Sequence, residues 1–248
     1  MSWEPLAIEG AYRVTQRVFG DSRGSFLEWF RAADLEAATG RALDLRQANL
    51  SVSAAGVLRG VHFADVPPGQ AKYVTCVSGA VLDVVVDLRV GSPTFGAWDS
   101  VLLDDESREA VFISEGLGHA FLSLQDGSVV TYLCSAPYAP AGEHGIDPLD
   151  PTLAIAWPTV GRDGSPLSLL LSDKDRDAPL ARRCARLRPA PAPRRRPVLH
   201  RHPLATTPPH PLDPTLSTPT LSAPTLSTPH ALDPHARPLR GSLEAKRT

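Results

Sequence analysis

Lysine is scarce in this sequence of 248 residues, although arginine is abundant. The chain contains 22 arginines but only three lysines, which are Lys72, Lys174 and Lys246. An ammonium group is a compact point charge that a planar guanidinium fork cannot mimic. Lys72 and Lys174, which lie in the motif-like stretches GQAKYV and LSDKDRDAPL, are therefore candidates for positions that require an ammonium. Chance is the alternative explanation, and one sequence leaves it open.

Aromatic residues are absent after Leu187, whereas proline becomes frequent there. Residues 189–238 hold 14 of the 25 prolines, and a proline recurs every five residues over 214–234. Such a segment cannot bury enough apolar surface to offset the entropy lost on ordering. A five-residue repeat is also too short to form a packing unit. The sequence therefore predicts one domain over residues 1–187 and a disordered, low-complexity tail over residues 188–248.

Basic residues are in the minority before the tail. The formal net charge of the chain is −2, but the segment from Pro189 onward has eight basic and three acidic residues. The preceding part therefore carries 17 basic and 24 acidic residues. An acidic domain argues against broad contact with the phosphate backbone of a nucleic acid. It still allows a small anionic ligand to be held by a few arginines.

Cysteines and long apolar runs are also few. Cys76, Cys134 and Cys184 are odd in number and show no CxxC spacing. No apolar run approaches the roughly 18 residues that a membrane-spanning helix needs. The N-terminal segment MSWEPLAIEG lacks the basic and apolar regions of a signal peptide. Together these features predict a cytoplasmic protein with reduced thiols and no membrane partner.

Short apolar segments are present in a regular series through the middle of the chain. They are VLDVVVDLRV (81–90), AWDSVLL (97–103), AVFIS (110–114), HAFLSL (119–124) and SVVTYLC (128–134). Strands at intervals of about 8–12 residues indicate an all-β sandwich or barrel.

Helical patterns are limited to two places. Residues 30–39 predict a helix that ends at Gly40, and residues 177–187 predict a weaker one. Three prolines over residues 145–158 predict a loop with an edge strand.

The segment GVLRGVHFADVPPGQAKYVTCVSG, residues 56–79, begins like the metal-binding motif of cupin barrels. That motif continues with a second His two residues after the first and with a Glu further on. Here His62 is present, but Ala64 stands at the second His and Gln70 lies near the place of the Glu. Neither a methyl group nor a neutral amide replaces imidazole or carboxylate at a divalent metal. We therefore expect no metal at this position.

Ten motifs in order over residues 5–183 resemble the dTDP-4-dehydrorhamnose 3,5-epimerases. They are FGDSRGSFLEWF, QANLSVS, LRGVHF, QAKYV, LDVVVDLRVGSPTFGAW, EGLGHAFLSL, TYLCSAPYAP, EHGI, AIAWP and LSDKDRDAPL. The resemblance implies a cupin-type jelly-roll barrel with short peripheral helices, a homodimer without cofactor or metal. It further implies epimerisation of a dTDP-4-keto-6-deoxyhexose at C3, C5 or both, in deoxysugar or antibiotic-sugar biosynthesis.

The same resemblance assigns four catalytic roles. His62 corresponds to the base that removes a proton next to the C4 ketone, and Asp175 to the carboxylate that orients it. Asp173 and Asp177 are nearby competitors for that second role. Tyr132 corresponds to the acid that returns a proton on the opposite face, because inversion requires delivery from that side. Lys72 corresponds to the residue that faces the developing enolate oxygen, where a positive charge stabilises the transition state most.

The resemblance also assigns the substrate contacts. Arg23 and Arg59 match contacts to phosphate and sugar, for which a guanidinium fork is suited. Tyr138 matches the residue that stacks on thymine. Further ligand-contacting positions are Glu28, Gln47, Asn49, His119, Glu143 and Lys174. For each of these six, an ordinary polar residue at a barrel rim is an equally good explanation.

Three other functions remain open at this stage. The first is the same chemistry restricted to C3 or to C5. The second is a cupin that binds a nucleotide sugar without catalysis, although such a protein would not need an opposed acid and base. The third is a metal-dependent cupin dioxygenase or isomerase, against which Ala64 and Gln70 argue.

Overall fold

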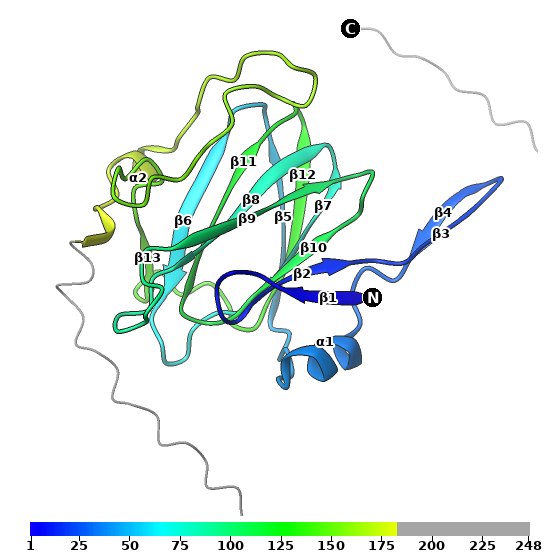
Figure 1. Cartoon of the computed structure of the whole chain (residues 1–248), viewed down its shortest axis with the longest axis horizontal. Coiled ribbons are helices and arrows are strands. Elements are labelled where there is room, and N and C mark those ends of the chain that lie inside the picture. The colour runs from blue at the N-terminus through cyan, green and yellow to red at the C-terminus, as the bar shows by residue number, and fades with distance from the viewer. Residues whose placement is uncertain (183–248) are drawn as a thin grey trace, which may run out of the picture. The chain divides into compact units, whose positions relative to one another are not determined.

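The chain folds into two antiparallel β-sheets and a separate β-hairpin (Figure 1). The structure, a computed structural model, describes residues 1–182; the predicted tail and residues 183–187 lie outside the described part. The six-stranded sheet has the order β1 (Ser2–Pro5), β2 (Ala11–Thr15), β10 (Ala110–Ile113), β7 (Lys72–Ser78), β12 (Ser128–Cys134), β5 (Gln47–Ser53). The five-stranded sheet has the order β13 (Glu143–Gly145), β6 (Leu58–Ala64), β11 (Leu117–Ser123), β8 (Ala80–Asp87), β9 (Trp98–Asp104).

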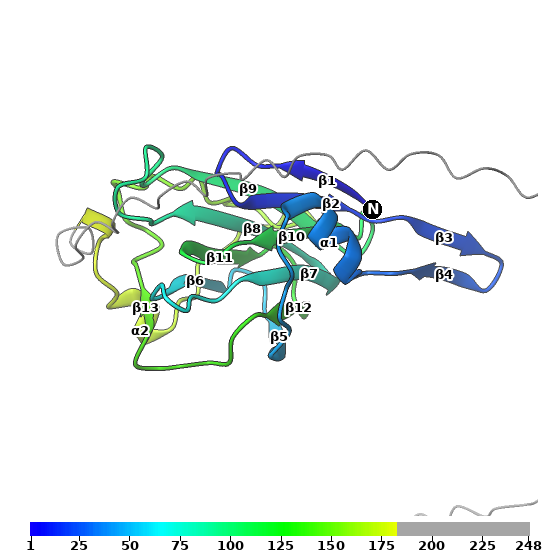
Figure 2. The ribbon, with the colours of Figure 1, turned by 90° about the horizontal axis from the view of Figure 1, so that it is seen from below.

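The connectivity is that of a jelly roll. From β5 onward, β5, β7, β10 and β12 lie in the larger sheet, whereas β6, β8, β9 and β11 lie in the smaller one. The chain therefore crosses between the sheets after almost every strand, as Figure 2 shows from another side. This confirms the predicted all-β jelly-roll fold. All five apolar segments predicted as strands are strands.

The valine-rich sequence of β8 is explained by the packing of apolar residues against both faces of this strand. Val81 and Val85 belong to the core cluster that also contains residues of the larger sheet, such as Val74. Val84 and Val86 belong to a second cluster, together with residues of the segment that follows β13. Because both faces of β8 are covered, its sequence does not alternate between apolar and polar residues.

The two predicted helices have different outcomes. Helix α1 (Ala32–Thr39) ends at Gly40, whose φ of 69° is left-handed, and this confirms the first prediction. The second prediction, over residues 177–187, is wrong for residues 177–180 and confirmed at residues 181–182, and a short helix, α2 (Asp173–Arg176), lies before it. Ser172 caps α2 at its start, and a residue before a proline disfavours helical geometry, so no helix runs through Ala178 into Pro179. No helix among residues 1–182 is long and apolar enough to cross a membrane.

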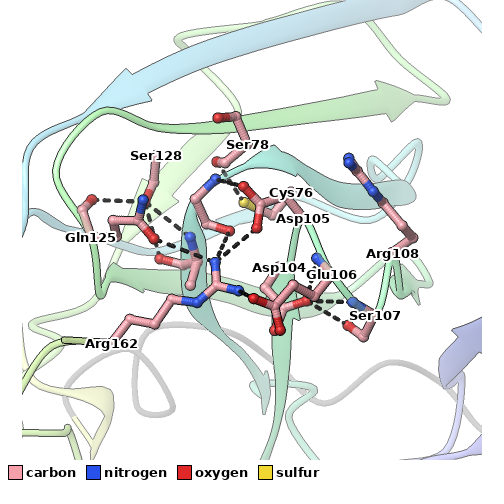
Figure 3. Close-up of polar contacts among 12 residues, drawn as sticks. Cys76, Ser78, Asp104, Asp105, Glu106, Ser107, Arg108, Gln125, Ser128 and Arg162 are labelled. Atoms are coloured by element: carbon pink, nitrogen blue, oxygen red, sulfur yellow. Dashed lines mark hydrogen bonds and ion pairs between the residues drawn. The ribbon is translucent and has the colours of Figure 1, made fainter. Parts of the chain in front are cut away.

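The segment that leads to α2 is anchored far from that helix by Arg162 (Figure 3). The guanidinium of Arg162 contacts Asp105 at 2.7 Å and Glu106 at 2.5 Å, in the turn after β9.

The cysteines among the described residues are reduced. Cys76 lies near Asp105 in Figure 3, and burial raises the pKa of its thiol to about 11. Cys76 and Cys134 are both free and buried, and Cys184 lies outside the described residues.

The other end of this segment is fixed to β6. Val57, just before β6, forms a parallel bridge with Leu170. The backbone N–H of Leu58 donates to the carbonyl of Leu170 at 2.9 Å, and the N–H of Leu170 donates to the carbonyl of Gly56 at 2.8 Å. A Cβ atom on Gly56 would lie 2.1 Å from the carbonyl oxygen of Ser168. Gly56 therefore allows the close approach that sets the segment against β6.

A two-stranded hairpin stands apart from both sheets. It consists of β3 (Val18–Asp21) and β4 (Gly24–Leu27) and projects away from the barrel in Figures 1 and 2. Phe19 and Phe26 pack on each other across it, yet they are 45% and 66% exposed. The hairpin thus presents apolar surface that the rest of residues 1–182 does not cover.

We predict that Gly56→Ala destabilises the fold more than Gly91→Ala. Both glycines have a left-handed φ, +82° at Gly56 and +88° at Gly91, but a Cβ at Gly91 meets nothing within 4 Å. The left-handed conformation alone costs an alanine about 1–2 kcal/mol. The clash at Gly56 adds a further 1–3 kcal/mol, roughly the cost of overpacking. Denaturant unfolding of both variants measures the difference, and equal losses would contradict the close approach.

Candidate functional site

A cavity of about 440 Å³, the larger of two that adjoin each other, is lined by residues of both sheets. Nine of the thirteen residues predicted to form the site line it: Gln47, Asn49, Arg59, His62, Lys72, His119, Tyr132, Tyr138 and Glu143. They come from β5, β6, β7, β11, β12, β13 and the loop before β13. Inward-facing positions of both sheets therefore converge on one polar cavity.

A second cavity of about 370 Å³ adjoins the first, because both are lined by Arg59 and His62. Lys174 and Asp175 of α2 line this second cavity, as does Ser172. Eleven of the thirteen predicted residues thus lie on two cavities that share His62.

His62 forms a tight pair with Asp175. Its Nε2 lies 2.6 Å from Oδ1 of Asp175, although the two residues are 113 positions apart in the chain. The His62 side chain is 39% exposed, whereas that of Asp175 is only 6% exposed. Since an ionised carboxylate can only accept, we assign the Nε2–H tautomer, which leaves Nδ1 of His62 free to take a proton.

Burial controls the proton affinity of His62. Burial lowers the pKa of the imidazole below its usual value, and the hydrogen bond and charge of Asp175 oppose that change. His62 is accordingly neutral around neutral pH, and the imidazolium that forms when it takes a proton has a carboxylate beside it. Both properties suit a general base.

His119 has its own carboxylate, which the sequence reasoning missed. Nε2 of His119 lies 2.7 Å from Oδ2 of Asp83, whose side chain is fully buried. His119 on β11 is also the cross-strand partner of His62 on β6. The available signal was a charged residue in the middle of the apolar strand VLDVVVD, where a buried carboxylate needs a partner.

Lys72 and Tyr132 bring a cation and a phenol to the same cavity. Burial lowers the pKa of Lys72, while Cys134 and Glu143 act in the opposite direction. Burial raises the pKa of Tyr132 above its usual value, so its hydroxyl keeps its proton at neutral pH. The cavity therefore contains a basic imidazole, a protonated phenol and a partly desolvated ammonium.

Two polar side chains hold the loop that carries Tyr138. Oε1 of Gln47 accepts from the backbone N–H of Tyr138 at 2.9 Å, and Oε1 of Glu143 accepts from that of Ala139 at 3.3 Å. Nε2 of Gln47 also donates to Oδ1 of Asn49 at 2.8 Å. Tyr138 itself is 54% exposed at the mouth of the cavity, where its ring is available to a ligand.

Arg23 and Glu28 line neither cavity of this chain. Arg23 lies at the turn of the β3–β4 hairpin, 88% exposed and paired with Asp21 at 2.5 Å. Glu28 directly follows β4 and lies 3.7 Å from Arg31. Their predicted ligand contacts are therefore not formed within the described part of one subunit.

Residues 1–182 contain no group of three or more His, Cys, Asp and Glu side chains arranged to hold a metal ion. Ala64 and Gln70, which stand near the ligand positions of the cupin motif, both line the larger cavity. The donors that remain there suit proton transfer and anion binding.

Comparison with known proteins gives a consistent result. The family model described as dTDP-4-dehydrorhamnose 3,5-epimerase matches residues 5–182. The dTDP-4-dehydrorhamnose 3,5-epimerase of Mycolicibacterium smegmatis is 60% identical over 179 residues, which cover 72% of this chain and 85% of the relative.

Two solved structures have the same fold. The epimerase of Mycobacterium tuberculosis matches with a TM-score of 0.71 and 56% identity, over 77% of this chain and 94% of the other. A 3'-monoepimerase from Streptomyces bikiniensis in complex with dTDP-quinovose matches with a TM-score of 0.69 and 50% identity, over 74% of this chain and 90% of the other.

We predict that Asp175→Asn lowers the pKa of His62 further. The hydrogen bond and charge of Asp175 raise that pKa against the effect of burial, and a neutral amide removes the charge. NMR titration of the His62 ring protons measures the change. Asp173→Asn is the matched control, because Asp173 lies in the same helix but is 91% exposed and pairs with Arg176. An equal effect of both substitutions, or none, would contradict the assigned pair.

Proposed function

Because this chain belongs to the dTDP-4-dehydrorhamnose 3,5-epimerase family, we propose that its larger cavity binds a dTDP-4-keto-6-deoxyhexose and inverts C3, C5 or both. The family is one of isomerases, and the placement of His62, Asp175, Tyr132 and Lys72 around one site carries the proposal. A protein that only bound the nucleotide sugar would not need a base and an acid in the same cavity.

Proton removal is the first step of the proposed reaction. Nδ1 of His62 takes the proton from the carbon next to the C4 ketone, and the C–H electron pair forms an enolate. Asp175 stabilises the imidazolium that results, as in other His–Asp pairs. The negative charge gathers on the C4 oxygen, where the ammonium of Lys72 stabilises it.

Proton return from the other face completes the inversion. The enolate electron pair takes the hydroxyl proton of Tyr132, which leaves a tyrosinate opposite a protonated His62. Tyr132 starts as a phenol because burial raises its pKa. Exchange of both groups with water restores the enzyme, so one solvent hydrogen enters the sugar at each inverted carbon.

The nucleotide part of the substrate has candidate contacts beside the reacting sugar. Arg59 lies at the junction of the two cavities and Lys174 in the second cavity, so we propose that they bind the diphosphate. Tyr138 is the proposed platform for thymine. Asn49, Gln47, His119 and Glu143 are proposed to contact the ligand from the walls of the larger cavity.

We propose a homodimer as the assembly that uses the β3–β4 hairpin. Its phenylalanines, Phe19 and Phe26, are exposed among residues 1–182, and Arg23 and Glu28 line neither of the two cavities described above. In a homodimer, a second copy of the chain covers the two phenylalanines, and the substrate in its cavity is the ligand for Arg23 and Glu28. Epimerisation restricted to C3 is the second candidate reaction, since a relative 50% identical to this chain is a 3'-monoepimerase.

Incubation with dTDP-4-keto-6-deoxyglucose in deuterium oxide tests the function. We predict deuterium in the sugar at C3, C5 or both, and its position defines which carbon is inverted. His62→Asn should slow this exchange about 10²–10⁴-fold, the usual effect of losing a general base. His144→Asn is the control, because His144 pairs with Asp65 at 3.0 Å and lines neither cavity.

Tyr132→Phe separates removal of the proton from its return in the same assay. Exchange by His62 should persist while epimerisation falls. Epimerisation by this variant at the native rate would assign the acid to another group. Binding of the nucleotide sugar by the wild-type protein without any exchange would overturn the catalytic proposal and favour a non-catalytic binder.

We predict that Lys72→Met lowers kcat more than it raises KM. The enolate charge exists only in the transition state and intermediate, so a cation that faces it acts mainly on turnover. Lys174→Met is the matched comparison and should mainly raise KM, because Lys174 is proposed to contact the diphosphate. Steady-state kinetics measures both, and a raised KM with unchanged kcat for Lys72→Met would make Lys72 a ground-state contact.

A further inference from the structure

Ser172 binds the catalytic carboxylate twice. Its hydroxyl donates to Oδ2 of Asp175 at 2.9 Å, and its oxygen accepts from the backbone N–H of Asp175 at 3.1 Å. A serine hydroxyl has one proton to donate and lone pairs to accept with, so both bonds can form at once. Ser172 is therefore tied both to the backbone and to the side chain of Asp175.

These bonds leave Asp175 with both carboxylate oxygens engaged. Oδ1 contacts His62 at 2.6 Å, and Oδ2 accepts from Ser172. The last torsion of an Asp side chain is broad, so a carboxylate held at one oxygen can still turn. A second bond at Oδ2 restricts that rotation and fixes the direction of Oδ1 toward the imidazole.

The helix that carries Asp175 cannot provide this precision alone. Helix α2 has only four residues, far fewer than an isolated helix needs for stability. Its position depends on Ser172 at the start and on Arg176, which donates to Asp173 at 2.8 Å and to the carbonyl of Leu171 at 3.2 Å. Of these two residues, Ser172 is the one that hydrogen-bonds to the carboxylate that contacts His62.

We propose that Ser172 is a positioning residue of the His62–Asp175 pair. Its hydroxyl holds the Asp175 carboxylate so that Oδ1 accepts from Nε2–H of His62 and keeps Nδ1 as the free nitrogen. Ser172 acts through Asp175 and does not need to touch the sugar. Its effect on turnover rests on the proposed epimerase function, whereas its effect on the His62 tautomer does not.

Three substitutions separate the hydroxyl from the helix cap. Ser172→Ala removes the hydroxyl and the cap, whereas Ser172→Gly removes the hydroxyl but keeps most of the capping preference. Ser172→Thr retains a hydroxyl. Thermal unfolding of each full-length variant shows how much stability the cap contributes.

Two readouts test the proposal. The first is the split between kcat and KM for dTDP-4-keto-6-deoxyglucose. The second is ¹⁵N NMR of His62 in the ligand-free protein, which distinguishes the Nε2–H tautomer from a mixture. We expect Ser172→Ala and Ser172→Gly to lower kcat about tenfold with little change in KM, about the effect of one hydrogen bond to a charged group. Both should show mixed tautomers, and Ser172→Thr should resemble the wild type.

The alternative outcomes are equally clear. Native kcat and a single tautomer in Ser172→Gly, with loss in Ser172→Ala, would assign Ser172 to capping alone and overturn the proposal. A raised KM with unchanged kcat would make Ser172 a ligand contact and would also overturn it. A wild-type protein without epimerase activity would refute the proposed function, and the tautomer measurement would still decide the role of Ser172.

Discussion

The pairing between Leu170 and the start of β6 is the constraint on which the site depends. His62 lies four residues after Leu58 along β6, and Asp175 lies five residues after Leu170, so the two proposed catalytic groups are positioned from one pair of backbone hydrogen bonds. Neither bond would form if a side chain at Gly56 pushed the segment away. A backbone contact at the rim of the barrel thus determines whether a base and its carboxylate meet at 2.6 Å.

Desolvation inside the barrel favours the neutral form of the proposed base and the protonated form of the proposed acid, but it disfavours the charged form of Lys72. It lowers the pKa of His62, so the base is neutral, and raises the pKa of Tyr132, so the acid is protonated. It also lowers the pKa of Lys72, while the neighbouring Glu143 opposes that change. One physical effect, the loss of water around a polar cavity between two apolar sheets, therefore favours the protonation states that the proposed acid and base need.

The fold could be predicted from the sequence because its signal is local. Five short apolar segments and the helix that ends at Gly40 depend on neighbouring residues, and all of them are confirmed. The helix predicted over 177–187 is present among the described residues only at 181–182, and the sequence pattern did not predict the short capped helix α2 that precedes it. The position of Asp83 in an apolar strand indicated that it needs a partner, but the identity of that partner, His119, depends on the register between β8 and β11. The same limit applies to Arg23, which lies on the hairpin and lines neither of the two cavities formed by residues 1–182.

The scarcity of lysine gains a physical explanation from where the arginines lie. Arg13 and Arg162 form planar contacts with carboxylates at the surface or at its edge, where a fork that reaches two oxygens is favoured. Lys72, by contrast, does not lie at the surface but on β7 in the wall of the larger cavity. A guanidinium there would need several acceptors, whereas an ammonium can leave one donor for an oxygen that becomes charged only during the reaction. This difference supports the proposal that Lys72 faces an oxygen whose charge is transient.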